Sequence, residues 1–279
     1  MQPGQPSRTA LGAARLRAAH QLIDGASILA DPLALRILGS DPETSLRHAQ
    51  AHPSGPRLRW FIVARSRIAE DALTVATGHG ARQLVVLGAG LDTLAYRTPL
   101  AERLRIYEID HPQTQAWKRQ LLAAAAIPLP ETLRFVAVDF ERETLADALA
   151  SAGFDPAQRS FFSWLGVVPY LTEQAVFSTL GYIAGLPGGA DVVFDYSNPA
   201  GAVASGGRAA HRALAEHVAA AGETFQSYFE TPRLCAELTA LGFNRVDDLG
   251  PEQVAARFFP AAERSASGRG GHIVHAATV

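Results

Sequence analysis

The sequence predicts an α/β fold built on a mostly parallel sheet, and two neighbouring segments carry this prediction. Gln83 to Leu87 is a short apolar run rich in Val and Leu, the pattern of a buried central strand, and Gly88-Ala89-Gly90 follows it directly. A second apolar segment ends in Asp110, about 20 residues after the glycines, which is the spacing at which an acid grips a nucleotide ribose. The unit indicates a site for an adenosine-type ligand, although a tight turn that binds nothing would look the same in sequence.

The residues after the glycines bear on which nucleotide would bind. A dinucleotide fingerprint needs a small residue three positions after the second glycine, and Thr93 stands there, preceded by Asp92. An anionic Asp92 would repel a pyrophosphate but suits a ligand that carries an amino group or a sulfonium. This favours S-adenosylmethionine over a nicotinamide dinucleotide.

Helical patterns precede the first strand. Apolar residues at helical spacing mark two of them, and Asp31-Pro32 has the form of an N-cap acid followed by Pro at the first helical position. The stretch 41–56 holds three prolines and is expected to be a loop. The order predicted for this part is a polar, disordered tail at 1–7, then helices at 9–22, from 31 onward and at 58–77.

After the glycine turn, strands and helices alternate, the pattern of parallel βαβ units. Pro112 and Thr231-Pro232 mark helix starts, and Gly222 marks a helix end. Short apolar runs bounded by turn residues mark the strands. The predicted helices are 99–103, 113–126, 143–150, 172–185, 211–221 and 231–240, and the predicted strands are 83–87, 104–109, 134–138, 160–165, 190–195, 242–249 and 271–277.

Three motifs give the chain a family resemblance. They are Leu87-Gly88-Ala89-Gly90-Leu91-Asp92-Thr93 with Tyr96-Arg97, then Tyr107-Glu108-Ile109-Asp110-His111-Pro112, and then Val138-Asp139-Phe140. Together they resemble the leucine carboxyl methyltransferases and the related bacterial polyketide O-methyltransferases, which are class I S-adenosylmethionine-dependent enzymes. The resemblance runs from about Thr9 to the C-terminus. It implies a Rossmann-like sheet of seven strands, mostly parallel with the last antiparallel, helices on both faces, an N-terminal helical extension and a lid.

The resemblance also implies roles for individual residues in holding the cofactor. The glycine turn of Gly88, Ala89 and Gly90 would approach it closely, and Asp110 would take the ribose hydroxyls. A basic residue of the first helix, here Arg17, would assist the cofactor, and Arg65 of the long helix would bind its carboxylate. Asp139 would accept from the adenine amino group, and the backbone amide of Phe140 would meet the ring.

One position departs from the family pattern. Many members carry a Glu near the cofactor where this chain has Leu165, so backbone groups or another side chain must substitute. Trp164 and Tyr170 lie near this position and are expected in the core or in the pocket wall, where aromatic rings would suit a flat substrate. The family places its substrate cover after the fifth strand, which predicts a lid at 196–230 with Tyr196 and His211 as candidate substrate contacts.

Composition bounds the remaining possibilities. The formal net charge of −2 predicts no strong attraction to nucleic acid or to an anionic membrane, and Lys118 is the only lysine. Cys235 is the only cysteine, and no carboxylate or histidine cluster has metal-ligand spacing, so neither an internal disulfide nor a metal site is expected. No hydrophobic run approaches the length of a membrane span, and a cytoplasmic protein is expected. The predicted organisation is one domain at 8–279, with N-terminal helices at 8–80, a cofactor-binding core at 81–195, the lid at 196–230 and C-terminal strands at 231–279.

The expected function is transfer of a methyl group from S-adenosylmethionine to a carboxylate or hydroxyl of a small molecule, for example a polyketide-type metabolite. A carboxylate acceptor is ionised at neutral pH and needs no general base, whereas a hydroxyl would gain from one, with His211 or Tyr196 as candidates. Three alternatives stay open: methylation of a protein C-terminal carboxylate, a cofactor-binding homologue without activity, and a nicotinamide-dependent oxidoreductase. The sequence does not predict the oligomeric state.

Overall fold

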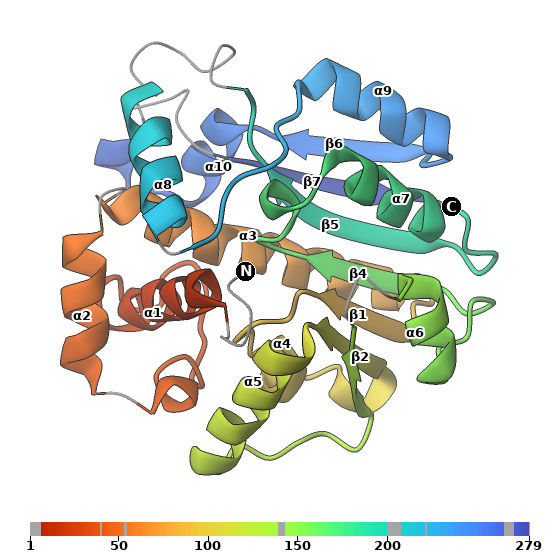
Figure 1. Ribbon diagram of the computed structural model, residues 1–279, viewed down its shortest axis with the longest axis horizontal. Coiled ribbons are helices and arrows are strands. Elements are labelled where there is room, and N and C mark those ends of the chain that lie inside the picture. The colour runs from red at the N-terminus through yellow and green to blue at the C-terminus, as the bar shows by residue number, and fades with distance from the viewer. Residues whose placement is uncertain are drawn as a thin grey trace.

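The computed structural model describes residues 7–39, 41–52, 55–138, 143–199, 208–220, 222–264 and 271–278. Within these ranges the chain forms a single seven-stranded sheet in the order β3-β2-β1-β4-β5-β7-β6 (Figure 1). Its strands are β1 (Gln83–Leu87), β2 (Arg105–Asp110), β3 (Leu133–Ala137), β4 (Ser160–Trp164), β5 (Ala190–Tyr196), β6 (Arg245–Leu249) and β7 (His272–Ala277).

The pairing within the sheet confirms the predicted fold class. The five strands β3, β2, β1, β4 and β5 run parallel, and β1 is their centre, with Val85 opposite Tyr107 on one side and Phe162 on the other. Strand β7 lies antiparallel between β5 and β6. The strand order reverses between β1 and β4, and such a switch point is where open α/β sheets bind ligands at the carboxyl ends of their strands.

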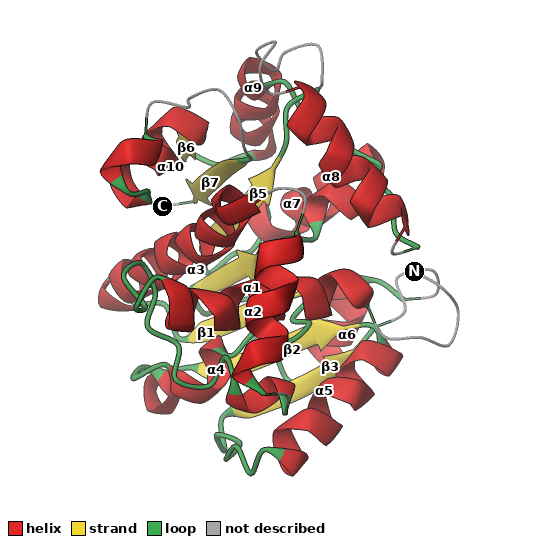
Figure 2. Cartoon of the chain, turned by 90° about the vertical axis from the view of Figure 1, so that its left-hand side faces the viewer, coloured by secondary structure: helices red, strands yellow, loops and turns green. Residues whose placement is uncertain are grey.

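Helices cover both faces of the sheet (Figures 1 and 2). They are α1 (Arg8–Ile23), α2 (Pro42–Ala51), α3 (Gly55–Gly78), α4 (Leu94–Arg97), α5 (Pro112–Ala124), α6 (Leu145–Ser151), α7 (Glu173–Ala184), α8 (Arg208–Ala220), α9 (Thr231–Leu241) and α10 (Pro251–Phe258), with short 3₁₀ helices η1 (Arg36–Leu38), η2 (Ala101–Arg103), η3 (Val168–Tyr170) and η4 (Ala261–Glu263).

Alternation along the strands divides the core between the two faces. On β1, Val85 and Leu87 pack with α6, α7 and α9, whereas Leu84 and Val86 pack with α3, α4 and α10. Successive side chains of a strand point to opposite faces, so a fully buried strand needs apolar residues at every position. This is why the apolar run at 84–87, which follows the hydrogen-bonded Gln83, identified β1 correctly.

The N-terminal layer differs from the prediction in three respects. The stretch 41–56 was expected to be a loop, but it contains α2, which Asp41 caps by accepting from the Thr44 amide at 2.8 Å. The helix expected from Asp31 is a turn followed by η1, because the Asp31 carboxylate is buried and engaged with other segments. Ser7, placed in the tail, caps α1 by accepting from the Ala10 amide at 3.1 Å.

The C-terminal part also holds more structure than predicted. Strands β6 and β7 are antiparallel neighbours, as expected, and α10 and η4, for which no prediction was made, lie between them in sequence. Pro251 begins α10 after Gly250, and Val254 and Ala255 bury its inner face. Among the described residues, no helix combines the length and the apolar character needed to cross a bilayer.

Candidate functional site

A cavity of about 540 Å³ opens at the carboxyl ends of the parallel strands. Its walls come from the first half of α1, the first half of α3, the turn after β1, the segment after β4, the end of β5, α8 and the start of α10. This is the size of an ordinary small-molecule site. The predicted residues Arg17, Arg65, Gly88, Ala89 and Gly90 all line it.

The turn after β1 needs glycine for two physical reasons. Gly88 has a φ of +63° and Gly90 a φ of +44°, both in the left-handed region that side chains with a Cβ avoid. A Cβ on Gly88 would also come 2.3 Å from a methyl carbon of Val167, which packs directly on the turn. The turn is closed by the Ala89 amide donating to the Ile109 carbonyl at 3.0 Å and the Asp92 amide donating to the Ala89 carbonyl at 2.8 Å.

Asp110 holds this turn against the end of β2. Its Oδ2 accepts from the Gly90 amide at 2.5 Å, and its Oδ1 accepts from the His111 amide at 2.7 Å. Burial raises the pKa of the Asp110 carboxyl, while these two amides oppose the rise. Each carboxylate oxygen has a second lone pair, so the group still has acceptor capacity for a ligand bound at the turn.

Arg65 reaches the cavity from α3 and is held by an acid that was not predicted. Its Nη1 lies 2.9 Å from Oδ2 of Asp195 at the end of β5, and Oδ1 of Asp195 accepts from the Gly166 amide at 2.6 Å. Both side chains are nearly buried and both line the cavity. Nε of Arg65 is buried and has no hydrogen-bond partner among the described residues.

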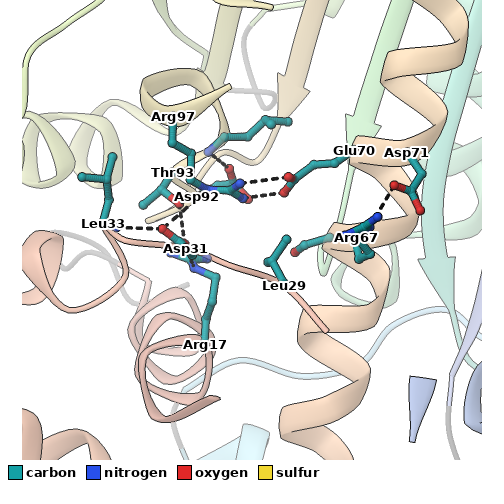
Figure 3. Close-up of polar contacts among 12 residues, drawn as sticks. Arg17, Leu29, Asp31, Leu33, Arg67, Glu70, Asp71, Asp92, Thr93 and Arg97 are labelled. Carbon is teal, nitrogen blue, oxygen red and sulfur yellow. Dashed lines mark hydrogen bonds and ion pairs between the residues drawn. The ribbon is translucent and has the colours of Figure 1, made fainter. Parts of the chain in front are cut away.

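Asp31 ties the N-terminal layer to the turn (Figure 3). Its carboxylate is buried and lies 2.8 Å from Nε of Arg17, while Thr93 Oγ1 donates to it at 2.6 Å. Arg17 Nη2 also donates to the carbonyl of Leu91 at 2.6 Å. Arg17 thus lines the cavity but uses both of these nitrogens to fix α1 on the residues that follow the glycines.

Arg97 extends this network to α3. Its Nη1 donates to Glu70 at 2.8 Å, its Nη2 makes a second bond to the same carboxylate, and its Nε donates to Thr93 Oγ1 at 3.1 Å (Figure 3). A bidentate pair of this kind fixes geometry as well as charge. Arg97 of the first motif therefore has a structural role.

The charged groups beside the turn favour the ionised form of the Asp92 carboxyl in the cavity wall. Burial opposes ionisation of Asp92, but Arg17, Lys118 and Arg97 together hold the pKa of its carboxyl below the usual value. Asp92 lines the cavity and accepts from the Leu94 amide at 2.6 Å. It stays ionised at neutral pH, as the interpretation in favour of a positively charged ligand requires.

Comparison with known proteins identifies the family. The sequence model described as leucine carboxyl methyltransferase matches residues 10–184. YktD of Bacillus subtilis (strain 168), provisionally named an S-adenosyl-L-methionine-dependent methyltransferase, is 33% identical over 224 residues, which cover 80% of this chain and 72% of YktD.

The chain belongs to the leucine carboxyl methyltransferase family.

Other comparisons give a partial sequence match and two matches of fold. A relative from Mycobacterium sp. (strain KMS) is 36% identical over 143 residues, so the match covers 50% of this chain and 47% of the relative's length. A duf574 family protein from Streptomyces avermitilis matches with a TM-score of 0.54 at 15% identity, and the match covers 96% of this chain and 97% of that protein's chain. A possible exported protein from Bordetella parapertussis matches with a TM-score of 0.53 at 12% identity, and the match covers 100% of this chain and 99% of that protein's chain.

As a member of this family the protein is a methyltransferase, and S-adenosylmethionine is its methyl donor. The nicotinamide-dependent and inactive alternatives therefore fall away. The residues present fit the donor: a glycine turn in the cavity wall, a buried Arg65 Nε that has no protein partner among the described residues, and an anionic Asp92 in the wall.

The remaining predicted residues divide into three groups. Leu165 and Tyr170 line the cavity, and the Tyr170 ring packs on Phe225 at 5.3 Å between centroids. The prediction that Trp164 contacts substrate is not supported, because alternation along β4 turns its ring into the core against Phe194. Asp139 and Phe140 lie outside the described residues, and so does the side chain of His211, whose backbone belongs to α8.

Tyr196 lies in the cavity wall, but its hydroxyl is already engaged. That hydroxyl lies 2.7 Å from Thr231 Oγ1 and donates to Asp248 at 3.0 Å, and the ring is only 1% exposed. Burial raises the Tyr196 pKa, which makes a phenolate base at neutral pH unfavourable. Sequence reasoning missed Asp195 instead, although its place as the last acid of a parallel strand was a signal.

Proposed function

We propose that this methyltransferase transfers the methyl group to an oxygen of a small acceptor, and that a carboxylate is the preferred acceptor group. The observation that carries the proposal is that Tyr170, Asp195 and Tyr196, three titratable groups of the described cavity wall, are poorly suited to act as general bases. Burial raises the pKa of Tyr170 to about 12, Asp195 is held by Arg65 and a backbone amide, and the Tyr196 hydroxyl is bonded elsewhere. An ionised carboxylate attacks without losing a proton, so it needs none of these groups.

The cavity supports an acceptor with an apolar body, such as a polyketide-type acid. Part of the cavity wall comes from α3, α8 and α10 and from the segments that follow α8 and α10. Its apolar residues include Leu58, Phe61, Val218, Phe225 and Phe259. The Phe61 ring is fixed against Gly271, where a Cβ would come 2.6 Å from the ring. Aromatic and aliphatic walls bind by area, so such a site would select for shape more than for polar groups.

In this proposal the cofactor-binding residues are those expected from the family motifs. Asp110 receives ribose hydroxyls, Arg65 receives the carboxylate, and the glycine turn lies against the bound molecule. When bound, S-adenosylmethionine supplies a methyl group already activated by its sulfonium. The chain's own contribution is then to orient the acceptor oxygen and exclude water, which can account for roughly 7–11 kcal/mol of the barrier.

We assign the lid role to α8 and the segment that follows it. Glu223 accepts from Thr9 Oγ1 at 2.7 Å and from Ser7 Oγ at 3.0 Å, which joins this segment to the N-terminus of α1. The residues after Glu223 contact η3, because the backbone amide of Gln226 donates to the Pro169 carbonyl at 2.7 Å. Leu214, Val218 and Phe225 of the lid contribute to the cavity wall.

A hydroxyl acceptor is the second candidate, and His52 is the observation that favours it. Among the described side chains that line the cavity, His52 is the histidine. An imidazole can act as a general base near neutral pH. With this acceptor, His52→Gln would lower turnover steeply. With a carboxylate acceptor the same substitution would leave turnover nearly unchanged.

The test is methyl transfer from donor labelled in the methyl group to a panel of apolar carboxylic acids, phenols and peptides with a free C-terminus. Mild alkali releases labelled methanol from a methyl ester but not from an aryl methyl ether. Alkali-labile product from small acids supports the proposal. Alkali-stable product would establish the hydroxyl alternative, and labelling of peptides alone would establish a protein C-terminal acceptor.

A further inference from the structure

Asp195 occupies a junction between three segments of the cavity. It is the last residue but one of β5, its Oδ1 accepts from the amide of Gly166 in the loop after β4, and its Oδ2 binds Arg65 of α3. The side chain is nearly buried, at 6% exposure, and Arg65 is 13% exposed. A charged hydrogen bond in such surroundings is stronger and more directional than one in water.

Arg65 is held on more than one side. Asp195 binds its Nη1, and its guanidinium lies on the Cα of Gly166, where a Cβ would come 2.6 Å from Nη2 and 3.0 Å from Cζ. Its Nε remains buried without a hydrogen-bond partner among the described residues. A guanidinium is a planar fork, so fixing one nitrogen and one face also fixes the direction of the remaining N–H groups.

We propose that Asp195 is a positioning residue that orients the Arg65 fork toward the carboxylate of the methyl donor. This rests on the proposed function, in which Arg65 receives that carboxylate. Asp195 acts through Arg65 and through the Gly166 loop, and it makes no contact with the carboxylate itself. It also balances the charge of Arg65 whenever the cavity is empty, because a buried unpaired guanidinium is unfavourable.

The same strand offers a matched control. Asp191 lies four residues earlier on β5, and its side chain is 8% exposed where that of Asp195 is 6%. It pairs with Arg159 at 2.8 Å and with His275 at 2.9 Å. It does not line the cavity. Asp191→Asn and Asp195→Asn therefore remove equivalent buried charges from one strand, one of them remote from the ligand.

The experiment is calorimetric titration of the full chain and its variants with three ligands. S-adenosylhomocysteine has both the amino group and the carboxylate, its desamino analogue keeps the carboxylate alone, and 5′-methylthioadenosine has neither. We expect Asp195→Asn to weaken the binding of S-adenosylhomocysteine and of its desamino analogue by the same factor, roughly 10- to 100-fold. The affinity for 5′-methylthioadenosine should stay unchanged. Asp191→Asn should leave all three affinities unchanged.

Different failures have different meanings. Unchanged affinity of Asp195→Asn for S-adenosylhomocysteine would overturn the inference, and so would a loss that disappears with the desamino analogue, because Asp195 would then bind the amino group directly. A parallel titration of Arg65→Lys separates the two levels. If Arg65→Lys binds normally, the proposed role of Arg65 fails; if only Asp195→Asn binds normally, that role stands and the positioning role fails. Should Asp195→Asn not fold, Asp195→Glu keeps the charge, shifts the carboxylate, and should show the same ligand pattern.

Discussion

The guanidinium of Arg65 lies directly on the Cα of Gly166, so close that a Cβ there would come within 2.6 Å of a guanidinium nitrogen. Gly166 also has a φ of +72° and donates its amide to Asp195. One glycine thus makes room for the cation, adopts a conformation that other residues avoid, and binds the acid that orients the cation. This contact lets steric and backbone effects be separated by experiment.

Gly166→Ala should weaken the binding of S-adenosylhomocysteine by about tenfold or more, because the new methyl group displaces Arg65. Gly153→Ala is the control, since Gly153 has a φ of +82° with nothing within 4 Å of an added Cβ. Both variants should lose about 1–2 kcal/mol of stability to the left-handed backbone. Calorimetry and chemical denaturation of the two proteins measure these effects. Equal affinities would show that Arg65 is not needed in its observed place.

Asp110→Asn should weaken the binding of S-adenosylhomocysteine by roughly 1–3 kcal/mol, because an amide can replace only part of what the carboxylate accepts. The Gly90 and His111 amides compete for the single remaining oxygen. Adenosine should lose affinity by the same amount, since the ribose is common to both ligands. If adenosine binds the variant as well as it binds the original protein, the ribose role belongs to another residue.

Glu223→Gln should speed the release of bound S-adenosylhomocysteine by about three- to tenfold, because the bonds from Ser7 and Thr9 lose their charged acceptor. Stopped-flow displacement measures this rate. Glu216→Gln on the exposed side of α8 is the control and should release ligand at the original rate. Identical rates for all three proteins would argue that this contact does not close the cavity.

His20 should make stability depend on pH below about pH 6.5, where the unfolded chain begins to take up a proton. Burial lowers the pKa of His20 from the usual 6.5. Nε2 of its fully buried ring accepts from the backbone amides of Ile28 at 3.3 Å and Leu29 at 3.4 Å, and Nδ1 lies 2.8 Å from Asp24. Below pH 6.5 the unfolded chain takes up a proton that the folded chain resists, so stability falls as pH falls, by at most about 1.4 kcal/mol per pH unit. Burial would raise the pKa of Asp24, but hydrogen bonds from Arg59, Trp60 and His20 lower it. The contribution of Asp24 to stability is therefore lost only below about pH 3.8. Denaturation series should show the slope in the original protein and not in His20→Asn.

Local patterns predicted most of the sheet and much of the site. Strand β1 was found because a strand buried on both faces is continuously apolar, and the glycine turn and Asp110 were found because their spacing is set by the βαβ unit. The helix α2 was missed because Pro42 at its first turn resembles a loop signal when prolines are merely counted. Burial of Asp31 could not be predicted either, since it depends on Arg17 and Thr93, which other segments supply.

The misses at the site have a similar cause. Which way Trp164 points depends on one residue of register in β4, and the fold places it in the core. The role of Asp195 depends on Arg65, 130 residues away in sequence. Contacts of this range come from the topology of the sheet, which a motif does not encode.

Calorimetric titration of the full chain with S-adenosylhomocysteine, with NADH in parallel, tests the central claim that the cavity at the glycine turn binds the methyl donor. We expect micromolar binding of S-adenosylhomocysteine, weaker binding in Asp110→Ala, and no heat from NADH. Binding of NADH alone, or binding of S-adenosylhomocysteine that survives both Asp110→Ala and Gly166→Ala unchanged, would contradict it.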